Sequence, residues 1–426
     1  MTRARWIGLG TVALLLAMLP LAPLLPHGGG DGGTARRAAG PAGAAPLVAG
    51  WGHLTPGYRR TIDHVVGDAL TAPRVAPTAS PRALADSLVR CATFEGQRYC
   101  LGQGWTDHTQ AQVQRRTARV AARQAARPAL ARTTGDLSTL DALRAAARMT
   151  PQQRADAERA ELRQAARSVA KVWLLRHQVE GVPLPQGFLA RHPEVRPEVR
   201  PDVRPEVRPT TTTSTTTTSG RIATVQTSGR SRAKHWRDYP KRGTVLDHHD
   251  VSAQRRTYWC GPTTMQMITW GWSGNRRPQR HWAHRLGTTT DGTSITSMVH
   301  VVNRYTGWDK ASHAGPYITL DISDWSFRKW ILLMARHTVD YRAPVVLHPI
   351  LLKRYYPYLD HDGSGHFQVG RGYKKRGDKT PLLGYFEPWN QQRFYPDEPY
   401  ISRVQWRSAY RSYRANRAHF QHNLGV

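Results

Sequence analysis

The chain has 426 residues, with 61 Lys and Arg against 30 Asp and Glu, which gives a formal net charge of +31. This length allows two or three domains, and a hydrophobic share of 39% indicates that part of the chain does not form a core. Three cysteines exclude a disulfide-dense scaffold and a four-cysteine zinc site within one chain, and the positive charge favours anionic partners.

The N-terminal apolar run predicts export. Arg3 and Arg5 precede an apolar segment from about residue 7 to 25, which is the layout of an export signal. Because no other long apolar run follows, the sequence excludes a polytopic membrane protein. We expect residues 1–26 to be a signal peptide or an uncleaved anchor and residues 27–48 to be a flexible leader. The protein is therefore expected to be secreted or associated with the cell envelope.

Residues 49–185 predict a mainly helical region with one disulfide. Export leads to an oxidising compartment, and Cys91 and Cys100 lie close enough in CATFEGQRYC to pair, which leaves Cys260 without a partner cysteine. Thr150, followed by a proline and then by apolar residues at helical spacing, predicts the start of a helix. No catalytic pattern is evident in this region.

A linker is expected to separate this region from the second half of the chain. Residues 186–220 contain four-residue PEVR-like repeats at 192–209 and a Thr/Ser run at 210–219. Regular prolines prevent helix and sheet hydrogen bonding, so we expect an extended spacer without a core. Residues 221–426 hold ten of the 14 tryptophans and 14 of the 16 tyrosines, which predicts a folded domain.

The surroundings of Cys260 suggest a nucleophile. The sequence QRRTYWCGPTTMQMITW places Pro262 where the first turn of a helix would lie, so Cys260 is expected at the helix N-terminus. The positive end of a helix stabilises a thiolate and predicts a lowered thiol pKa. Gly261 leaves room for a substrate backbone. Gln254, six residues before Cys260, could donate to a developing oxyanion together with the Cys260 amide.

A candidate general base and a candidate acid follow Cys260 in the chain. His366 stands at the start of an alternating strand, after a Gly-Ser-Gly turn, and residues 343–350 and 382–390 are predicted strands on either side in the chain. The second of these strands ends at Glu387. An acid on a neighbouring strand can orient an imidazole by accepting a hydrogen bond from its second nitrogen.

These residues resemble the papain-like cysteine peptidases, most closely the bacteriocin-processing (double-glycine) peptidase family and its relatives that lack a transporter. The resemblance covers roughly residues 244–390. It implies an α+β fold in which the cysteine-bearing helix packs on an antiparallel sheet that carries the histidine and the acid. The matching residues are Gln254, Cys260, Gly261, Pro262, Gly365, His366 and Phe367.

The resemblance implies an exported cysteine peptidase that hydrolyses peptide bonds through a Cys260 thiolate and His366, with peptide or protein substrates and no cofactor. The acid here is Glu387, whereas the family has Asp, so Asn390 and Asp362 are alternative orienting residues. An acyl transferase would use the same groups with another acceptor, and this alternative stays open.

The remaining histidines could suggest a metal site. His248 and His249 have acidic neighbours, as does His361, and His281 and His284 lie three residues apart. None of them falls in a zinc signature such as HExxH, so no metal is expected.

The basic tail suggests a second function. Arg403, Arg407, Arg411 and Arg414 are spaced three to four residues apart with aromatic residues between them, which predicts a basic stripe on a helix. The alternative function is therefore a catalytically inactive papain-like module that adheres to anionic envelope polymers or lipid head groups. Because export separates the protein from intracellular nucleic acid, we expect no specific nucleic-acid partner.

Overall fold

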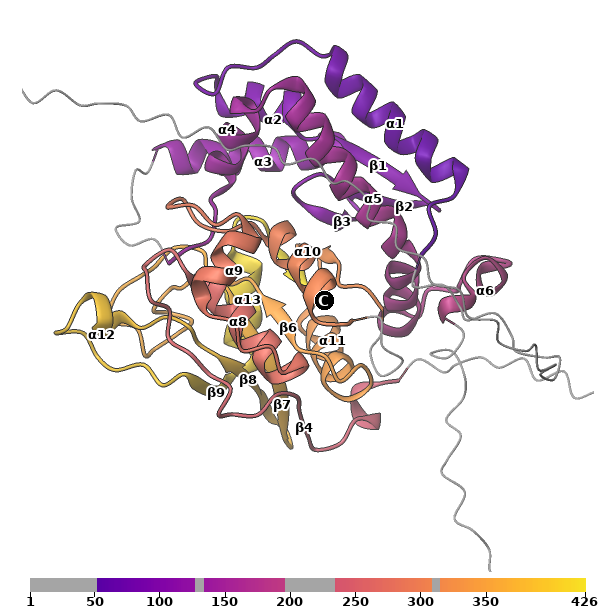
Figure 1. Cartoon of the computed structure of the whole chain (residues 1–426). Coiled ribbons are helices and arrows are strands. Elements are labelled where there is room, and N and C mark those ends of the chain that lie inside the picture. Colours follow the sequence, from indigo (N-terminus) through magenta and orange to yellow (C-terminus); the bar gives the residue numbers. More distant parts are fainter. Residues whose placement is uncertain (1–51, 127–133, 196–233, 309–314) are drawn as a thin grey trace, which may run out of the picture. The chain divides into compact units, whose positions relative to one another are not determined.

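The computed structural model describes residues 52–126, 134–195, 234–308 and 315–426, and Figure 1 shows their helices and strands coloured along the sequence. The expected export segment, the leader and most of the expected linker lie outside these ranges. None of the helices within them combines the length and the apolar character that crossing a membrane requires.

The first part of the fold, up to residue 195, is mainly helical, and it also contains a short antiparallel ladder. Its helices are α1 (Pro56–Thr71), α2 (Pro81–Leu88), α3 (Gln110–Ala126), α4 (Thr139–Arg148), α5 (Pro151–Leu175), which continues into a π-helical turn (Arg176–Glu180), and α6 (Phe188–Arg191). The ladder strands are β1 (Cys91–Phe94), β2 (Gln97–Cys100) and β3 (Gly104–Thr106). A disulfide joins Cys91 to Cys100 across the first two strands.

Helix α5 begins as its sequence predicts. The Thr150 hydroxyl oxygen accepts a hydrogen bond from the backbone N–H of Gln153, and the Gln153 side-chain oxygen accepts one from the backbone N–H of Thr150. Each side chain therefore satisfies a backbone N–H group that has no partner within the helix. The apolar stripe that follows is buried. Glu158, which interrupts this stripe, pairs with Arg90, and this pairing compensates the burial of its charge.

The second part of the fold mixes helices with most of the sheet, so the fold is α+β as expected. The helices are α8 (Cys260–Ser273), α9 (Gln279–Leu286), α10 (Ile295–Tyr305), α11 (Phe327–Val339), α12 (Gln391–Phe394) and α13 (Ala409–Ala418). The strands are β4 (Arg242–Thr244), β5 (Thr319–Asp321), β6 (Val345–Leu347), β7 (Gln368–Arg376), β8 (Lys379–Phe386), β9 (Val404–Ser408) and β10 (Asn423–Gly425).

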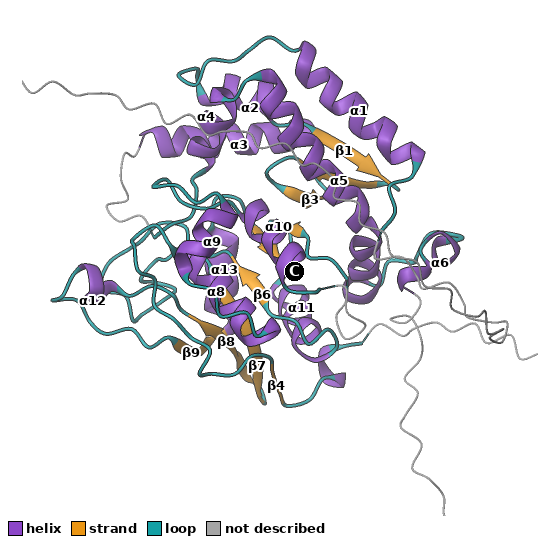
Figure 2. Cartoon of the chain, viewed as in Figure 1, coloured by secondary structure: helices purple, strands orange, loops and turns teal. Residues whose placement is uncertain are grey.

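One largely antiparallel sheet runs through both parts. Its strand order is β1-β2-β3-β5-β10-β6-β7-β8-β9, and β4 pairs with β7; the strands β7, β8 and β9 lie side by side (Figure 2). Val369 on β7 pairs with Phe386 on β8. Because neighbouring antiparallel strands run in opposite directions, this register brings His366, just before β7, to the same end of the sheet as Glu387, just after β8.

The predicted helical stripe of arginines in the tail was wrong for Arg403 and Arg407, whereas Arg411 and Arg414 lie on α13. Residues 404–408 form β9, in which Trp406 pairs with Gly384 on β8. The Trp406 ring lies over this glycine, since a Cβ atom there would come within 2.8 Å of the ring. Tight aromatic packing in the sheet therefore overrides the helical spacing, and a helix begins only at residue 409.

The expected linker also begins later than predicted. Phe188 and Val195, which fall within the expected linker, are buried in a cluster with Ala170 and Leu174 of α5. Two large apolar side chains so placed hold this stretch against the helix.

The burial of α5 predicts the effect of a core truncation. Leu162 is fully buried, so Leu162→Ala should lower the free energy of unfolding by about 2–5 kcal/mol through lost burial and the cavity left behind. Urea unfolding followed by circular dichroism measures this difference. The matched control is Leu70→Ala, because Leu70 is 42% exposed; equal effects of the two changes would contradict the packing described for α5.

Candidate active site

Cys260 lies at the N-terminus of α8, as predicted. No side-chain cap precedes it, and the backbone N–H groups of Phe367 and Gly261 act to lower the pKa of its thiol. The Thr264 hydroxyl donates to the Phe367 carbonyl at 3.2 Å and ties the helix to the segment that carries His366. The cysteine and the histidine motif, more than a hundred residues apart in the chain, therefore meet at one place.

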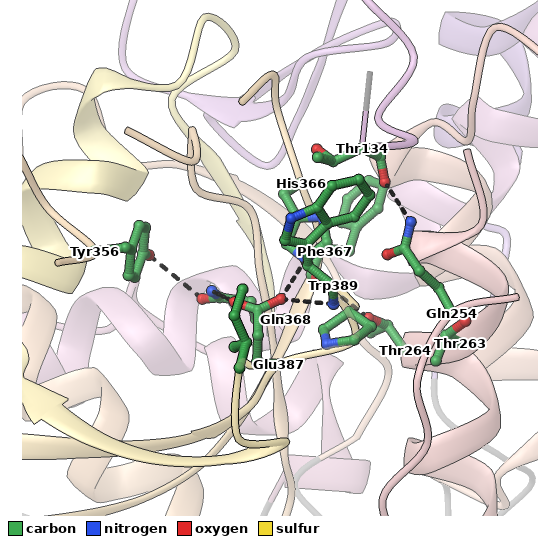
Figure 3. A network of polar contacts seen from close by, with 12 residues as sticks. Thr134, Gln254, Thr263, Thr264, Tyr356, His366, Phe367, Gln368, Glu387 and Trp389 are labelled. Carbon is green, nitrogen blue, oxygen red and sulfur yellow. Dashed lines mark hydrogen bonds and ion pairs between the residues drawn. The ribbon is translucent and has the colours of Figure 1, made fainter. Parts of the chain in front are cut away.

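His366 and Glu387 form a buried hydrogen-bonded pair. The His366 Nε2 lies 2.7 Å from the Glu387 Oε1 (Figure 3), and both residues are fully buried. The Tyr358 hydroxyl and the Gln368 amide each donate to Oε2 at 2.7 Å, and the Trp389 N–H donates to Oε1 at 2.9 Å. These four donors satisfy the carboxylate and hold it in one position.

This pairing fixes which nitrogen of His366 is available. Because the carboxylate accepts, Nε2 carries the proton, and Nδ1 has no hydrogen-bond partner among the described residues. Nδ1 can therefore take a proton from a neighbouring acid. Burial acts to raise the pKa of Glu387, but the electrostatic interaction with His366 and the hydrogen bonds from His366, Tyr358 and the Trp389 N–H together outweigh it, so the pKa lies below its usual range.

The sequence analysis considered three residues for orienting the imidazole, and the structure places Glu387 against the His366 ring. Asp362 instead accepts a hydrogen bond from the Lys353 backbone N–H at 2.8 Å, and Asn390 is the residue that precedes α12. The Glu387 side chain thus reaches the imidazole from the position directly after β8.

Gln254 is buried beside this group, but its amide is occupied. Its Nε2 donates to the backbone carbonyls of Arg256 at 3.0 Å and Thr257 at 2.9 Å, and a longer contact of 3.4 Å reaches the Thr134 carbonyl (Figure 3). Its Oε1 has no hydrogen-bond partner among the described residues. The role of Gln254 as an oxyanion donor stays a prediction.

A segment from the first part of the fold covers the site. We call residues 134–137 the strap. The Thr134 hydroxyl donates to the Gly365 carbonyl at 2.7 Å, and the Thr134 N–H donates to the Ser364 hydroxyl at 2.9 Å. Beside the strap, Cys260 and His366 are fully buried. The sequence analysis missed this segment, whose four residues carry no recognisable motif.

The predicted lowering of the Cys260 pKa was wrong for the covered site. Burial raises the pKa of the thiol well above its usual value. The N–H groups of Phe367 and Gly261 act in the opposite direction, and the nearby carboxylates of Asp136 and Glu387 add to the rise. Among the described residues, no hydrogen bond joins Cys260 to His366.

Three groups of histidines and acids among the described residues bring their ligand atoms close enough to share an ion. Two of these groups contain histidines that the sequence analysis considered as metal ligands, and all members of the third group are buried. The groups are Asp247-His248-His249, Asp360-His361-Glu398 and Asp136-His348-His419. In the buried group the Gln421 N–H donates to the His419 Nδ1, so Nε2 carries the proton and donates to Asp136. A protonated Nε2 does not bind a metal.

Comparison with known families agrees with this geometry. Residues 247–415 match the family described as Peptidase_C39 like family. The match includes Cys260, His366 and Glu387 but not the strap. No curated protein and no solved structure matches the chain significantly.

Burial and the raised pKa together predict slow thiol chemistry. In the intact chain near pH 7, iodoacetamide should alkylate Cys260 on the order of 100-fold more slowly than in the urea-unfolded chain, because the thiolate is the reactive form and is scarce here. Mass spectrometry of the labelled peptide measures both rates, and the disulfide keeps Cys91 and Cys100 unreactive. Equal rates would show that the site is open.

Proposed function

Because residues 247–415 form a domain of the C39-like peptidase family, we propose that the protein is an exported cysteine peptidase that hydrolyses peptide bonds through Cys260 and His366. The observation that carries this proposal is the His366–Glu387 pair, which leaves an unpartnered imidazole nitrogen in the same buried site as a cysteine at a helix N-terminus. A nucleophile, a base and an orienting acid are the parts that this chemistry needs.

The proposed reaction begins with proton transfer from the Cys260 thiol to the His366 Nδ1. Glu387 stabilises the imidazolium that results, and the N–H groups of Phe367 and Gly261, which already meet the sulfur, stabilise the thiolate. In the covered site the thiol and the imidazole are not hydrogen-bonded, so this step follows entry of a substrate. The thiolate then attacks the acyl carbon, and His366 protonates the leaving amine.

Gln254 and the Cys260 amide would hold the oxyanion. The Gln254 Nε2 already contacts a peptide carbonyl, that of Thr134, and the first N–H groups of a helix have no partner within the helix. Water then releases the acyl enzyme. An amine in place of water would give acyl transfer with the same residues.

The test is cleavage of a peptide library by the full chain, with the products identified by mass spectrometry. Cys260→Ser and His366→Ala should each lower kcat/KM by about 1000-fold or more, because either change removes the activated nucleophile. Asp362→Asn should leave the rate unchanged, since Asp362 holds the Lys353 backbone instead of the imidazole. Products that persist in Cys260→Ser would contradict the proposal.

A second candidate is an inactive module that binds anionic envelope polymers. The observation in its favour is that Arg407, Arg411 and Arg414 are exposed, while other residues of α13 are buried. Arg403 does not join this surface, because its guanidinium donates to the backbone carbonyls of Trp389 and Ile401.

Binding to an anionic polysaccharide such as heparin tests this candidate. Changing Arg407, Arg411 and Arg414 together to Gln should weaken binding about 10-fold or more and reduce its salt dependence. The matched control removes the same charge elsewhere, from the exposed residues Arg59, Arg60 and Arg115. Binding that does not respond to salt, or that both triple variants weaken equally, would rule out a specific basic surface.

A further inference from the structure

The strap occupies the candidate active site as a bound peptide would. We propose that residues 134–137 are an internal peptide ligand of this site, and that the site recognises peptides in which glycine is followed by an acidic residue. The proposal rests on the proposed function in that it names the class of substrate. Its evidence consists of the backbone, glycine and carboxylate contacts of the strap.

The strap backbone pairs with the loop before α10. The Thr293 N–H donates to the Gly135 carbonyl at 2.9 Å, and the Leu137 N–H donates to the Thr293 carbonyl at 2.9 Å, which makes a parallel bridge between Asp136 and Thr293. Such main-chain bonds are a general way to bind an extended peptide and do not depend on its side chains.

The position of Gly135 accepts glycine alone. Its φ is +111°, and a Cβ atom there would come within 2.5 Å of the Tyr258 carbonyl carbon. On the other side, Gly292 also has a positive φ, and a Cβ atom on it would come within 2.5 Å of the Gly135 carbonyl oxygen. Two glycines thus face each other where the strap crosses the site, and a side chain on either would force the backbones apart.

The next residue of the strap places a carboxylate between two histidines. The Asp136 Oδ1 lies 2.8 Å from the His348 Nε2, and its Oδ2 lies 2.9 Å from the His419 Nε2. All three side chains are buried. Gly365, the residue before His366, leaves the space for this contact, since a Cβ atom there would overlap Asp136 and come within 2.5 Å of the His419 Nε2.

The hydrogen bonds around the histidines indicate a site built for a negative charge. The His348 Nδ1 lies 2.7 Å from the Asn423 Oδ1, so His348 faces an oxygen atom on each of its two nitrogens. His419 is neutral, because burial and the charge of His348 lower its pKa to about 4. Two buried imidazole nitrogens therefore meet the carboxylate, and a ligand without a carboxylate would leave both of them buried without a partner.

The strap contacts both sides of the catalytic group. Its Thr134 carbonyl faces the amide of Gln254, which precedes Cys260, and its Thr134 hydroxyl reaches the residue next to His366. A peptide substrate has to lie between the same two sides. It must therefore displace the strap, and one with the Gly-acidic pair can replace the contacts that Gly135 and Asp136 make.

The experiment uses the full chain with Asp136→Ala and measures iodoacetamide labelling of Cys260, with circular dichroism to verify folding. Labelling should be faster by about 10-fold or more, because the strap loses its only charged contact. Asp136→Asn should give an increase in the same direction. Asp156→Asn, which removes an exposed carboxylate on α5, is the matched control and should leave the rate unchanged.

A synthetic peptide tests the recognition. On Asp136→Ala, the peptide RTTGDLS, which copies residues 132–138, should restore protection of Cys260. The peptides RTTADLS and RTTGNLS should protect at least about 10-fold less well, because one adds a side chain at the glycine crossing and the other removes the charge.

Several outcomes would overturn the inference. One is a folded Asp136→Ala chain whose Cys260 is as protected as in the wild type, and another is equal protection by all three peptides. Should both Asp136 variants fail to fold, Thr134→Val, which replaces the hydroxyl with a methyl group, should still speed labelling, and an unchanged rate would overturn the inference.

These readouts need no catalysis, so the two proposals fail separately. Faster labelling of Cys260 in Asp136→Ala and selective protection by RTTGDLS, without cleavage of any peptide by the wild-type chain, would contradict the proposed function and leave the inference standing. Cleavage by Asp136→Ala without preference for the Gly-acidic pair, and without protection by RTTGDLS, would contradict the inference alone.

Discussion

The hydrogen bond between His366 and Glu387 is the contact on which the rest of the site depends. Both side chains are fully buried, and a buried charge is costly unless it is paired and hydrogen-bonded. Glu387 meets this condition through the imidazole and three further donors. The pair fixes the proton on Nε2, leaves Nδ1 free to accept one, and requires β7 and β8 to keep the register that brings both residues to one end of the sheet.

The same rule governs the carboxylate of the strap. Asp136 comes from the first part of the fold, yet it is buried against His348 and His419 of the second part. Burial alone would raise the pKa of Asp136, but the two imidazoles hold it well below its usual range. The first part of the fold is therefore tied into the site, and its ladder also joins the main sheet through β3 and β5.

The features that the sequence predicted correctly are those with local signals. Neighbouring residues are enough to predict the cap at Thr150, the helix that begins at Cys260 and the strand that ends just before Glu387. The strap could not be predicted, because its partners lie 120 to 283 residues away in the chain. The predicted lowering of the thiol pKa was wrong for a related reason, since the helix N-terminus is visible in the sequence whereas the burial of Cys260 in the fold is not. In the tail, the spacing of the arginines indicated a helix, but contacts with β8 decided otherwise.

Hydrogen exchange of individual backbone amides in the native full chain tests most directly whether the strap covers the site. The Leu137 N–H bonds to the Thr293 carbonyl and the Thr293 N–H bonds to the Gly135 carbonyl, so both amides should exchange slowly near pH 7, at rates comparable to amides of β7 and β8. Exchange of these two amides at the rate of a free peptide, while β7 and β8 stay protected, would show that the strap does not occupy the site and would contradict the account.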